Sequence, residues 1–225
     1  IGAGFGKPLL TMNNNTEGTV SYTNLLCIPS SKPFDLFNPD RKSSLKLYIN
    51  RVFITDKCDN LIPAYLRFVK GIVDTQDIDL NVSREMLQNN PAVAKISKSL
   101  VGKILRELKK IADKDKAKYI QFWNEFGQVL KEGLYEDLER KDTLLELARF
   151  SNNENDDLIS LEDYVNAMDK NQKDIYYIAA DTKSQALSSP HLEGFKSKGI
   201  KVLVMADPID QFWLSMACLL YTSPS

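Results

Sequence analysis

The stretch SLEDYVNAMDKNQKDIYYIAADTKSQALSSPHLEGFKSKGIKVLVMA, residues 160–206, decides the fold class of this chain of 225 residues. Ser160 begins a predicted helix, and the run DIYYIAA (174–180) predicts a strand. Residues 190–198 have a helical pattern, and the apolar run KVLVMA (201–206) predicts a buried strand. A parallel pair of strands joined by a crossover helix is right-handed. The stretch therefore predicts a small α/β unit.

Helices are predicted in the central part of the chain. Asn90 is a favourable N-cap and Pro91 a favourable first residue of a long helix with one apolar stripe. The other side of this helix is basic, which is typical of a solvated face; contact with phosphate or nucleic acid is the alternative. Two further helices are expected over residues 116–134 and 140–150, and the polar run SNNENDD (151–157) is the best internal domain boundary. The apolar stripe consists of Val93, Ile96, Leu100, Val101, Ile104, Leu105, Leu108 and Ile111.

The amino-terminal part predicts two strands separated by a long loop. Residues 17–29 are rich in β-branched and aromatic side chains, and residues 45–55 alternate apolar with polar ones. The loop between them is longer than a connection without a function usually is. A short helix is predicted over residues 64–73, followed by a polar segment, 74–90, that contains one helical turn.

The order of strands and helices along the whole chain predicts an α/β fold. We expect two αβα sandwich subdomains, the larger one first, joined by a helical connector. The large subdomain is placed at residues 1–113, the connector at 114–150 and the small subdomain at 151–217.

Composition excludes several classes of protein. The chain is 43% hydrophobic and 26% charged, which is typical of a globular protein, and its net charge of -1 argues against a nucleic-acid binder. Cys27, Cys58 and Cys218 form no CxxC pair, and the single histidine, His191, cannot build a multi-histidine metal site. The glycines of residues 2–6 follow no predicted strand, so a dinucleotide fingerprint is not indicated. No run of 18 apolar residues and no signal peptide is visible.

The long loop carries three apolar side chains, Phe34, Leu36 and Phe37. Either they fold back onto the core, or they form an exposed apolar binding patch. The sequence alone leaves both alternatives open.

The run LNVSREMLQ (80–88) departs from the charge pattern that is usual at the start of a helix. Its serine is a good N-cap, which places Arg84 in the first helical turn, where a cation opposes the helix dipole. Gln88 lies on the same helix face as Arg84, and Asn81 precedes both in the loop. A guanidinium assisted by two amides suits a phosphate oxyanion supplied from elsewhere. The alternative is a surface salt bridge to Glu85 or another acid.

Four runs of the sequence closely resemble the middle domain of the heat shock protein 90 chaperones, and the bacterial form of the family looks nearest. The match extends over about residues 17–213. The runs are LKLYINRVFITD (45–56), LIPAYLRFVKGIVDTQDIDLNVSREMLQ (61–88), FWNEFGQVLKEGLYED (122–137) and SLEDYVNAMDKNQKDIYYIAAD (160–181).

The resemblance implies a dimeric, cytoplasmic, ATP-driven chaperone of unfolded or partly folded clients. In this family ATP with Mg²⁺ is held mainly by an amino-terminal domain, and the dimer contacts lie in a carboxy-terminal domain; we expect both to be absent from this chain. The fragment alone is therefore expected to bind no ATP, and no metal, nucleic-acid or membrane partner is expected.

The resemblance also implies roles for individual residues. Arg84 of the intact SREMLQ motif would reach the γ-phosphate, Asn81 and Gln88 would be its supporting polar residues, and Phe53 would help to place the catalytic loop. The loop with Phe34, Leu36 and Phe37 would contact clients. A client- or partner-binding module without a catalytic part is the alternative function; there, Arg84 could be held in a buried ion pair.

The last eight residues, CLLYTSPS (218–225), depart from the family. They resemble the translation of a transposase adapter used in sequencing libraries. We expect a non-native tail, and the alternative is a natural hydrophobic end.

Overall fold

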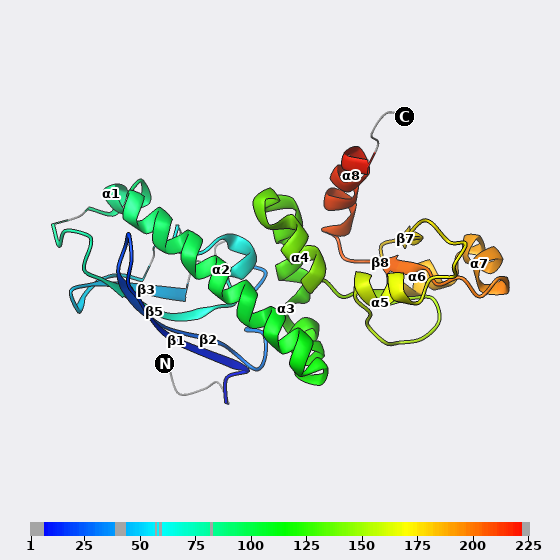
Figure 1. Cartoon of the computed structure of the whole chain (residues 1–225), viewed down its shortest axis with the longest axis horizontal. Coiled ribbons are helices and arrows are strands. Elements are labelled where there is room, and N and C mark those ends of the chain that lie inside the picture. The colour runs from blue at the N-terminus through cyan, green and yellow to red at the C-terminus, as the bar shows by residue number, and fades with distance from the viewer. Residues whose placement is uncertain (1–6, 39–43, 57, 59, 82, 222–225) are drawn as a thin grey trace. The chain divides into compact units, whose positions relative to one another are not determined.

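The computed structural model forms two compact units, Ile1–Val129 and Leu130–Ser225, and each is described by itself (Figure 1). Both units combine a β-sheet with helices, so the predicted α/β class is confirmed. The boundary between the units falls within helix α3 (Lys116–Glu136). The structure describes residues 7–38, 44–56, 58, 60–81 and 83–221, and the glycine run at the start of the sequence lies outside them.

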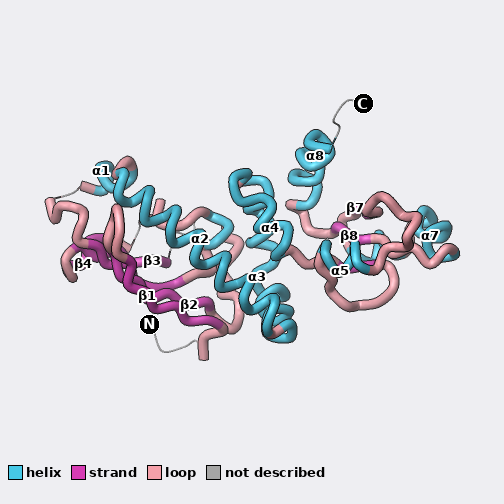
Figure 2. Tube along the Cα trace, viewed as in Figure 1, coloured by secondary structure: helices cyan, strands magenta, loops and turns pink. Residues whose placement is uncertain are grey.

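The first unit is built on a five-stranded sheet with the order β1-β2-β5-β3-β4. Figure 2 shows the strands of this unit in magenta. Strands β3 and β5 are parallel, and the other neighbouring pairs are antiparallel. The strands are β1 (Leu10–Thr16), β2 (Tyr22–Ile28), β3 (Ser44–Ile49), β4 (Val52–Thr55) and β5 (Lys70–Thr75).

Helix α2 (Pro91–Lys114) packs on this sheet through its apolar stripe. It begins as predicted, because the Asn90 side chain accepts a hydrogen bond from the Ala92 amide at 2.8 Å and Pro91 is the first helical residue. The hydroxyl of Tyr22 on β2 and that of Ser99 on α2 are 2.8 Å apart. The predicted stripe is buried except at its end, where Ala112 is buried and Ile111 only partly so.

The prediction of one strand over residues 45–55 is wrong, because this segment forms the hairpin β3–β4. The turn residues Asn50 and Arg51 have φ angles of 50° and 66°. Asparagine tolerates this left-handed conformation. The alternation of apolar and polar residues ends at Asn50, where the chain reverses, and Val52, Phe53 and Ile54 follow as a continuous apolar run.

The helix predicted over residues 64–73 is also wrong. Only the 3₁₀ turn η1 (Ala64–Leu66) is helical, and strand β5 follows it. Strand β5 pairs with β2 and β3, and Gly71 permits the pairing with β2: a Cβ on this residue would lie 2.1 Å from the Leu25 carbonyl oxygen. Glycine permits this close approach of two backbones, which no helical periodicity can reveal.

The first strand prediction is confirmed only in part. Strand β2 occupies the second half of residues 17–29, and the first half forms the turn from β1. Strand β1 was not predicted at all, since its run of three asparagines has a low intrinsic preference for strands.

The second unit contains a three-stranded sheet with the order β6-β8-β7. Strands β7 and β8 are parallel, and β6 is antiparallel to β8. The predicted capping of helix α5 is present, because Ser160 and Asp163 form a capping box. The elements are η2 (Leu138–Arg140), α4 (Lys141–Leu147), β6 (Ser151–Asn152), α5 (Leu161–Asn166), β7 (Tyr177–Ala179), α6 (Lys183–Leu187), η3 (Pro190–Leu192), α7 (Glu193–Ser197), β8 (Leu203–Met205) and α8 (Asp210–Tyr221).

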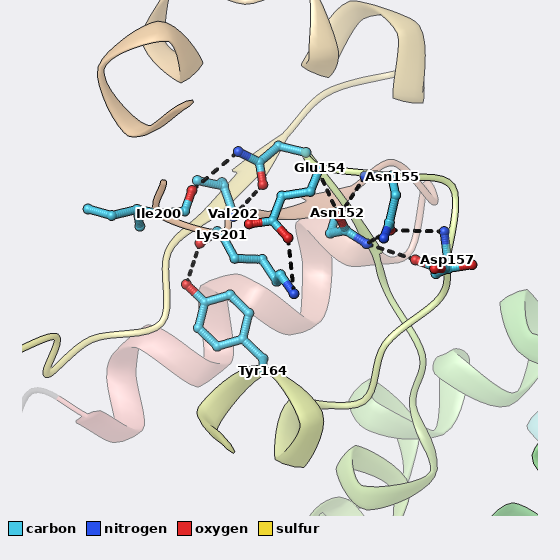
Figure 3. A network of polar contacts seen from close by, with 9 residues as sticks. Asn152, Glu154, Asn155, Asp157, Tyr164, Ile200, Lys201 and Val202 are labelled. Carbon is cyan, nitrogen blue, oxygen red and sulfur yellow. Dashed lines mark hydrogen bonds and ion pairs between the residues drawn. The ribbon is translucent and has the colours of Figure 1, made fainter. Parts of the chain in front are cut away.

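The polar run at residues 151–157 is a folded part of this unit (Figure 3). Asn152 is buried, and its side-chain oxygen accepts hydrogen bonds from the amides of Glu154 and Asn155 at 2.8 and 3.1 Å. Its side-chain nitrogen donates to the Asn155 side chain and to the Asp157 carbonyl at 2.9 and 2.8 Å. The buried amide is thus fully satisfied and holds the turn after β6 in one shape.

Removal of residues 218–225 is expected to change the melting temperature by less than about 2 °C, because the last few residues of a chain usually contribute little to its stability. Thermal unfolding followed by circular dichroism measures this change. Removal of residues 213–225 is the matched comparison: it also takes away the buried Trp213 and should cost clearly more. A fall of more than about 5 °C for the shorter deletion would show that the tail is part of the fold.

Candidate functional site

The predicted phosphate-directed motif lies after strand β5, where helix α1 (Arg84–Gln88) forms as the expected single turn. The Ser83 side chain accepts a hydrogen bond from the Met86 amide at 3.3 Å, so the predicted N-cap is present. Leu87 is buried and fixes the short helix to the unit, whereas its neighbour Met86 is exposed. The helix is therefore anchored by one apolar residue, and its Glu85 and Gln88 side chains are exposed.

The predicted site residues around α1 are placed as follows. Arg84 is the first residue of the helix, and its side chain lies outside the described part of the structure. Asn81 and Gln88 are both exposed, before and at the end of this helix. The Asn60 side chain donates a hydrogen bond to the Gln88 carbonyl oxygen at 2.6 Å, which ties the end of α1 to an earlier loop.

The β3–β4 turn and the loop that leads to α1 leave the sheet at the same edge. Strands β3 and β5 are parallel, and Ile49 pairs with Thr75, so their carboxyl ends coincide. The Asn50 amide donates to the Thr75 carbonyl at 3.0 Å, and the Arg51 amide donates to an Asp74 carboxylate oxygen at 3.1 Å. This edge is the usual place for ligands in open sheets with parallel strands.

Phe53 belongs to this edge. It lies on β4 just after the turn, is half exposed, and contacts the ring of Tyr48 edge-on with 5.6 Å between centroids. The turn is thus joined to the end of β5 by one backbone hydrogen bond and one hydrogen bond to a carboxylate, and the aromatic pair lies beside the turn. The residues come from segments about 30 positions apart in the sequence.

In the loop after β2, the structure shows which apolar residues fold back onto the core and which are exposed. Leu36 is fully buried, Phe34 is fully exposed and Phe37 is half exposed. The Arg67 Nε donates to the Leu36 carbonyl oxygen at 2.9 Å, and its guanidinium lies 6.0 Å from the Phe37 ring centroid. Leu36 therefore anchors the loop in the core, and the two phenylalanines form its outer surface.

The residues that the structure describes show few other features of a metal-binding, membrane-spanning or reactive site. No group of three or more His, Cys, Asp or Glu side chains there has the arrangement of a metal site. Every helix in these described segments is too short or too polar to cross a bilayer. Burial raises the pKa of the Cys27 thiol, which makes it less reactive.

A buried charge cluster in the second unit was missed by sequence reasoning. Lys131 on α3 is buried, and its ammonium lies 2.7 Å from Asp207 and 3.0 Å from Asp210. The Trp213 indole donates to Asp210 at 2.8 Å, and the Lys131 ammonium lies 5.0 Å from the Phe150 ring centroid. The sequence does contain a signal for this cluster: Lys131 interrupts an apolar helix segment, and Asp207 and Asp210 precede Trp213.

Comparison with known proteins agrees with this architecture. The sequence model of the family described as Hsp90 protein matches residues 3–218. The chain belongs to the Hsp90 family. Among curated relatives it is 55% identical, over 211 residues, to Chaperone protein HtpG of Paramagnetospirillum magneticum, and 52% identical, over 210 residues, to that of Roseobacter denitrificans. These alignments cover 94% and 93% of this chain and 34% of each relative, so the chain spans about a third of their length.

A solved structure places the chain within the Hsp90 architecture. The middle domain of a Plasmodium falciparum heat shock protein matches with a TM-score of 0.81 and 33% identity, covering 96% of this chain and 84% of that one. The resemblance to an Hsp90 middle domain drawn from the sequence is confirmed.

Proposed function

We propose that this chain is the middle segment of an ATP-dependent chaperone, in which it completes the ATPase through Arg84 and contributes to client binding. The observation that carries the proposal is the intact SREMLQ motif on an exposed turn, at the sheet edge shared by the ends of β3 and β5. Such an edge can be approached by a nucleotide that another domain holds.

The residues at this edge have the donor set that a phosphate group requires. A guanidinium presents several fixed N–H donors, and the exposed side-chain amides of Asn81 and Gln88 add more. ATP with Mg²⁺, bound mainly by the amino-terminal domain of a longer parent, would supply the phosphate. Arg84 would then stabilise the negative charge that develops at the γ-phosphate, and Phe53 would support the turn beside it.

Client binding is assigned to the outer surface of the loop after β2. Phe34 and Phe37 offer apolar surface to an unfolded segment, and Leu36 holds the loop that carries them. In the parent protein the partners would be its own amino-terminal ATPase domain, unfolded or partly folded clients, and a second subunit bound through a carboxy-terminal domain. We place this chaperone in the cytoplasm.

The exposed Phe34 equally favours a second candidate, a client-binding module without a catalytic part. The two candidate functions differ in the role of one residue, because only the first requires Arg84 for ATP turnover. Exchange of Arg84 in the parent protein therefore discriminates between them.

The isolated chain is expected to hydrolyse no ATP above background and to slow the aggregation of a non-native client weakly. Its catalytic arginine acts only on a nucleotide held elsewhere, whereas exposed phenylalanines need no nucleotide to contact a client. Calorimetry with ATP and light scattering of a heat-denatured client measure the two parts. The double exchange Phe34→Ser and Phe37→Ser should remove at least half of the protection.

Leu138→Ser is the matched control, because Leu138 is an apolar residue elsewhere in the chain whose exposure lies between those of Phe37 and Phe34. It should leave the protection unchanged. Millimolar or tighter ATP binding with turnover would contradict the split catalytic site. Full protection by the double variant would contradict the client surface.

A further inference from the structure

The second unit contains a polar hollow that the proposed function does not use. Its volume is about 610 Å³, within the range of ligand pockets in proteins. It lies at the amino ends of the parallel strands β7 and β8, since Tyr176 and Lys201 precede these strands and line it. Further walls come from the turn after β6, the end of α5 and the turn between α7 and β8. The lining includes Glu154, Tyr164, Met168, Gln172, Lys198 and Lys201.

The floor of the hollow is preformed. Tyr164 is buried, and its hydroxyl donates a hydrogen bond to the Lys201 carbonyl oxygen at 2.7 Å (Figure 3). The same hydroxyl accepts from the Gln172 side chain and from the Tyr176 amide, both at 3.0 Å. A ligand would therefore meet a fixed surface and would not have to order it first.

The hollow is lined by two lysines, Lys198 and Lys201, and by two acids, Glu154 and Asp169. The ammonium of Lys201 lies 3.2 Å from a carboxylate oxygen of Glu154, and Figure 3 shows this pair above Tyr164. The side chain of Lys198 has no ion pair or hydrogen bond with any other described residue. Asp169, the second acid of the lining, accepts the Asn171 amide in its own turn at 2.9 Å. One ammonium is thus open, and another is held by an exposed carboxylate that a ligand carboxylate can replace.

The remaining lining residues fit a peptide better than a small inorganic anion. Gln172 uses both hydrogens of its side-chain nitrogen, on the Tyr164 hydroxyl and on the Asp174 carbonyl at 2.8 Å. Its side-chain oxygen accepts no hydrogen bond within the described chain and can receive one from a peptide N–H. Met168 and Ile200 add apolar walls, and the volume greatly exceeds that of a single anion.

We propose that this hollow binds a short peptide segment through a carboxylate, which Lys198 holds together with Lys201 once Lys201 has left Glu154. The carboxylate is either an acidic side chain or a free chain end. The proposal stands apart from the proposed function, because it needs neither Arg84 nor the phenylalanine loop.

Binding of three tetrapeptides to the 225-residue chain tests the proposal. Two of them are blocked at both ends, and the third has a free carboxyl end. The first is acetyl-Leu-Glu-Ala-Leu-amide, the second has Gln in place of Glu, and the third is the Gln peptide with a free carboxyl end. Titration followed by ¹H–¹⁵N spectra should move the amide signals of residues 168–172 and 198–201. The Glu peptide should bind about threefold to fivefold more tightly than the Gln peptide, the range expected for a partly exposed ion pair. The third peptide shows whether a chain end can replace the side chain.

Two variants with opposite expected effects separate ligand binding from a structural role. Lys198→Met should reduce the preference for the carboxylate, because only Lys201 is then left to hold it. Glu154→Gln should increase the preference about threefold, because it releases Lys201. Lys196→Met is the matched control, since Lys196 is exposed nearby and does not line the hollow. The proposal is overturned if no signals move at 10 mM peptide, if all three peptides bind equally, if acetate alone binds as tightly, or if Glu154→Gln weakens binding.

Discussion

In a full-length chain that contains this segment, Arg84→Ala lowers the rate of ATP hydrolysis by about tenfold or more, while ATP still binds. The reason is that Arg84 would contribute a preorganised positive charge only where negative charge develops at the γ-phosphate. Loss of one such group from a transition state costs a few kcal/mol, and about 1.4 kcal/mol corresponds to a factor of ten in rate. The affinity for ATP changes little because the adenine and the other phosphates are held by another domain.

The measurement is steady-state phosphate release at saturating ATP, with nucleotide affinity determined separately by calorimetry. Glu85→Gln is the matched control, because Glu85 follows Arg84 in the same exposed helix turn and has no proposed contact with the nucleotide. Normal turnover by a well-folded Arg84→Ala protein would remove Arg84 from the mechanism and favour the module without a catalytic part.

Lys131→Met lowers the free energy of unfolding of the second unit by about 3–5 kcal/mol. The side chains of Lys131 and Asp210 are only 4% and 1% exposed, so methionine would leave the Asp210 carboxylate buried without its cation. The Trp213 indole and the Asp207 amide still donate to Asp210, but they do not neutralise its charge. A buried, uncompensated charge of this kind is among the largest single contributions to instability.

Urea unfolding followed by the fluorescence of Trp213 measures this effect in a Trp123→Phe background, which leaves one tryptophan in the chain. Lys118→Met on the same helix is the control and should change the free energy of unfolding by less than about 0.5 kcal/mol. The double variant Lys131→Met, Asp210→Asn should recover part of the loss, because it removes both charges. A loss below about 1 kcal/mol for Lys131→Met would mean that solvent reaches the cluster.

Helix α2 and the motif on α1 could be predicted from the sequence because their determinants lie close together along the chain. Asn90 and Pro91 specify the start of α2 through contacts within one turn, and its apolar stripe recurs with the helical period. Ser83 caps α1 in the same local manner. The role of Arg84 stays a prediction, since its basis is the match of the motif to the family.

Strand β5 and the β3–β4 hairpin could not be predicted in this way. The apolar residues Leu66, Val69 and Val73 have a spacing that fits a helix as well as a segment entering a sheet. What selects the strand is the pairing of β5 with β2 and β3, segments that are far apart from it in the sequence. Gly71 permits this pairing, because a Cβ there would collide with Leu25.

The sequence by itself determined the α/β class, the family and the long amphipathic helix, because periodicity, caps and motifs act within a few residues. Only the tertiary structure decided that Leu36 is buried while Phe34 is exposed, and that Lys131 meets two aspartates more than 70 positions away. The hollow around Tyr164 likewise exists only in the tertiary structure, since each segment that lines it looks like an ordinary polar turn in the sequence. Burial and ion pairing depend on which distant segments exclude water together, and a local pattern does not contain that information.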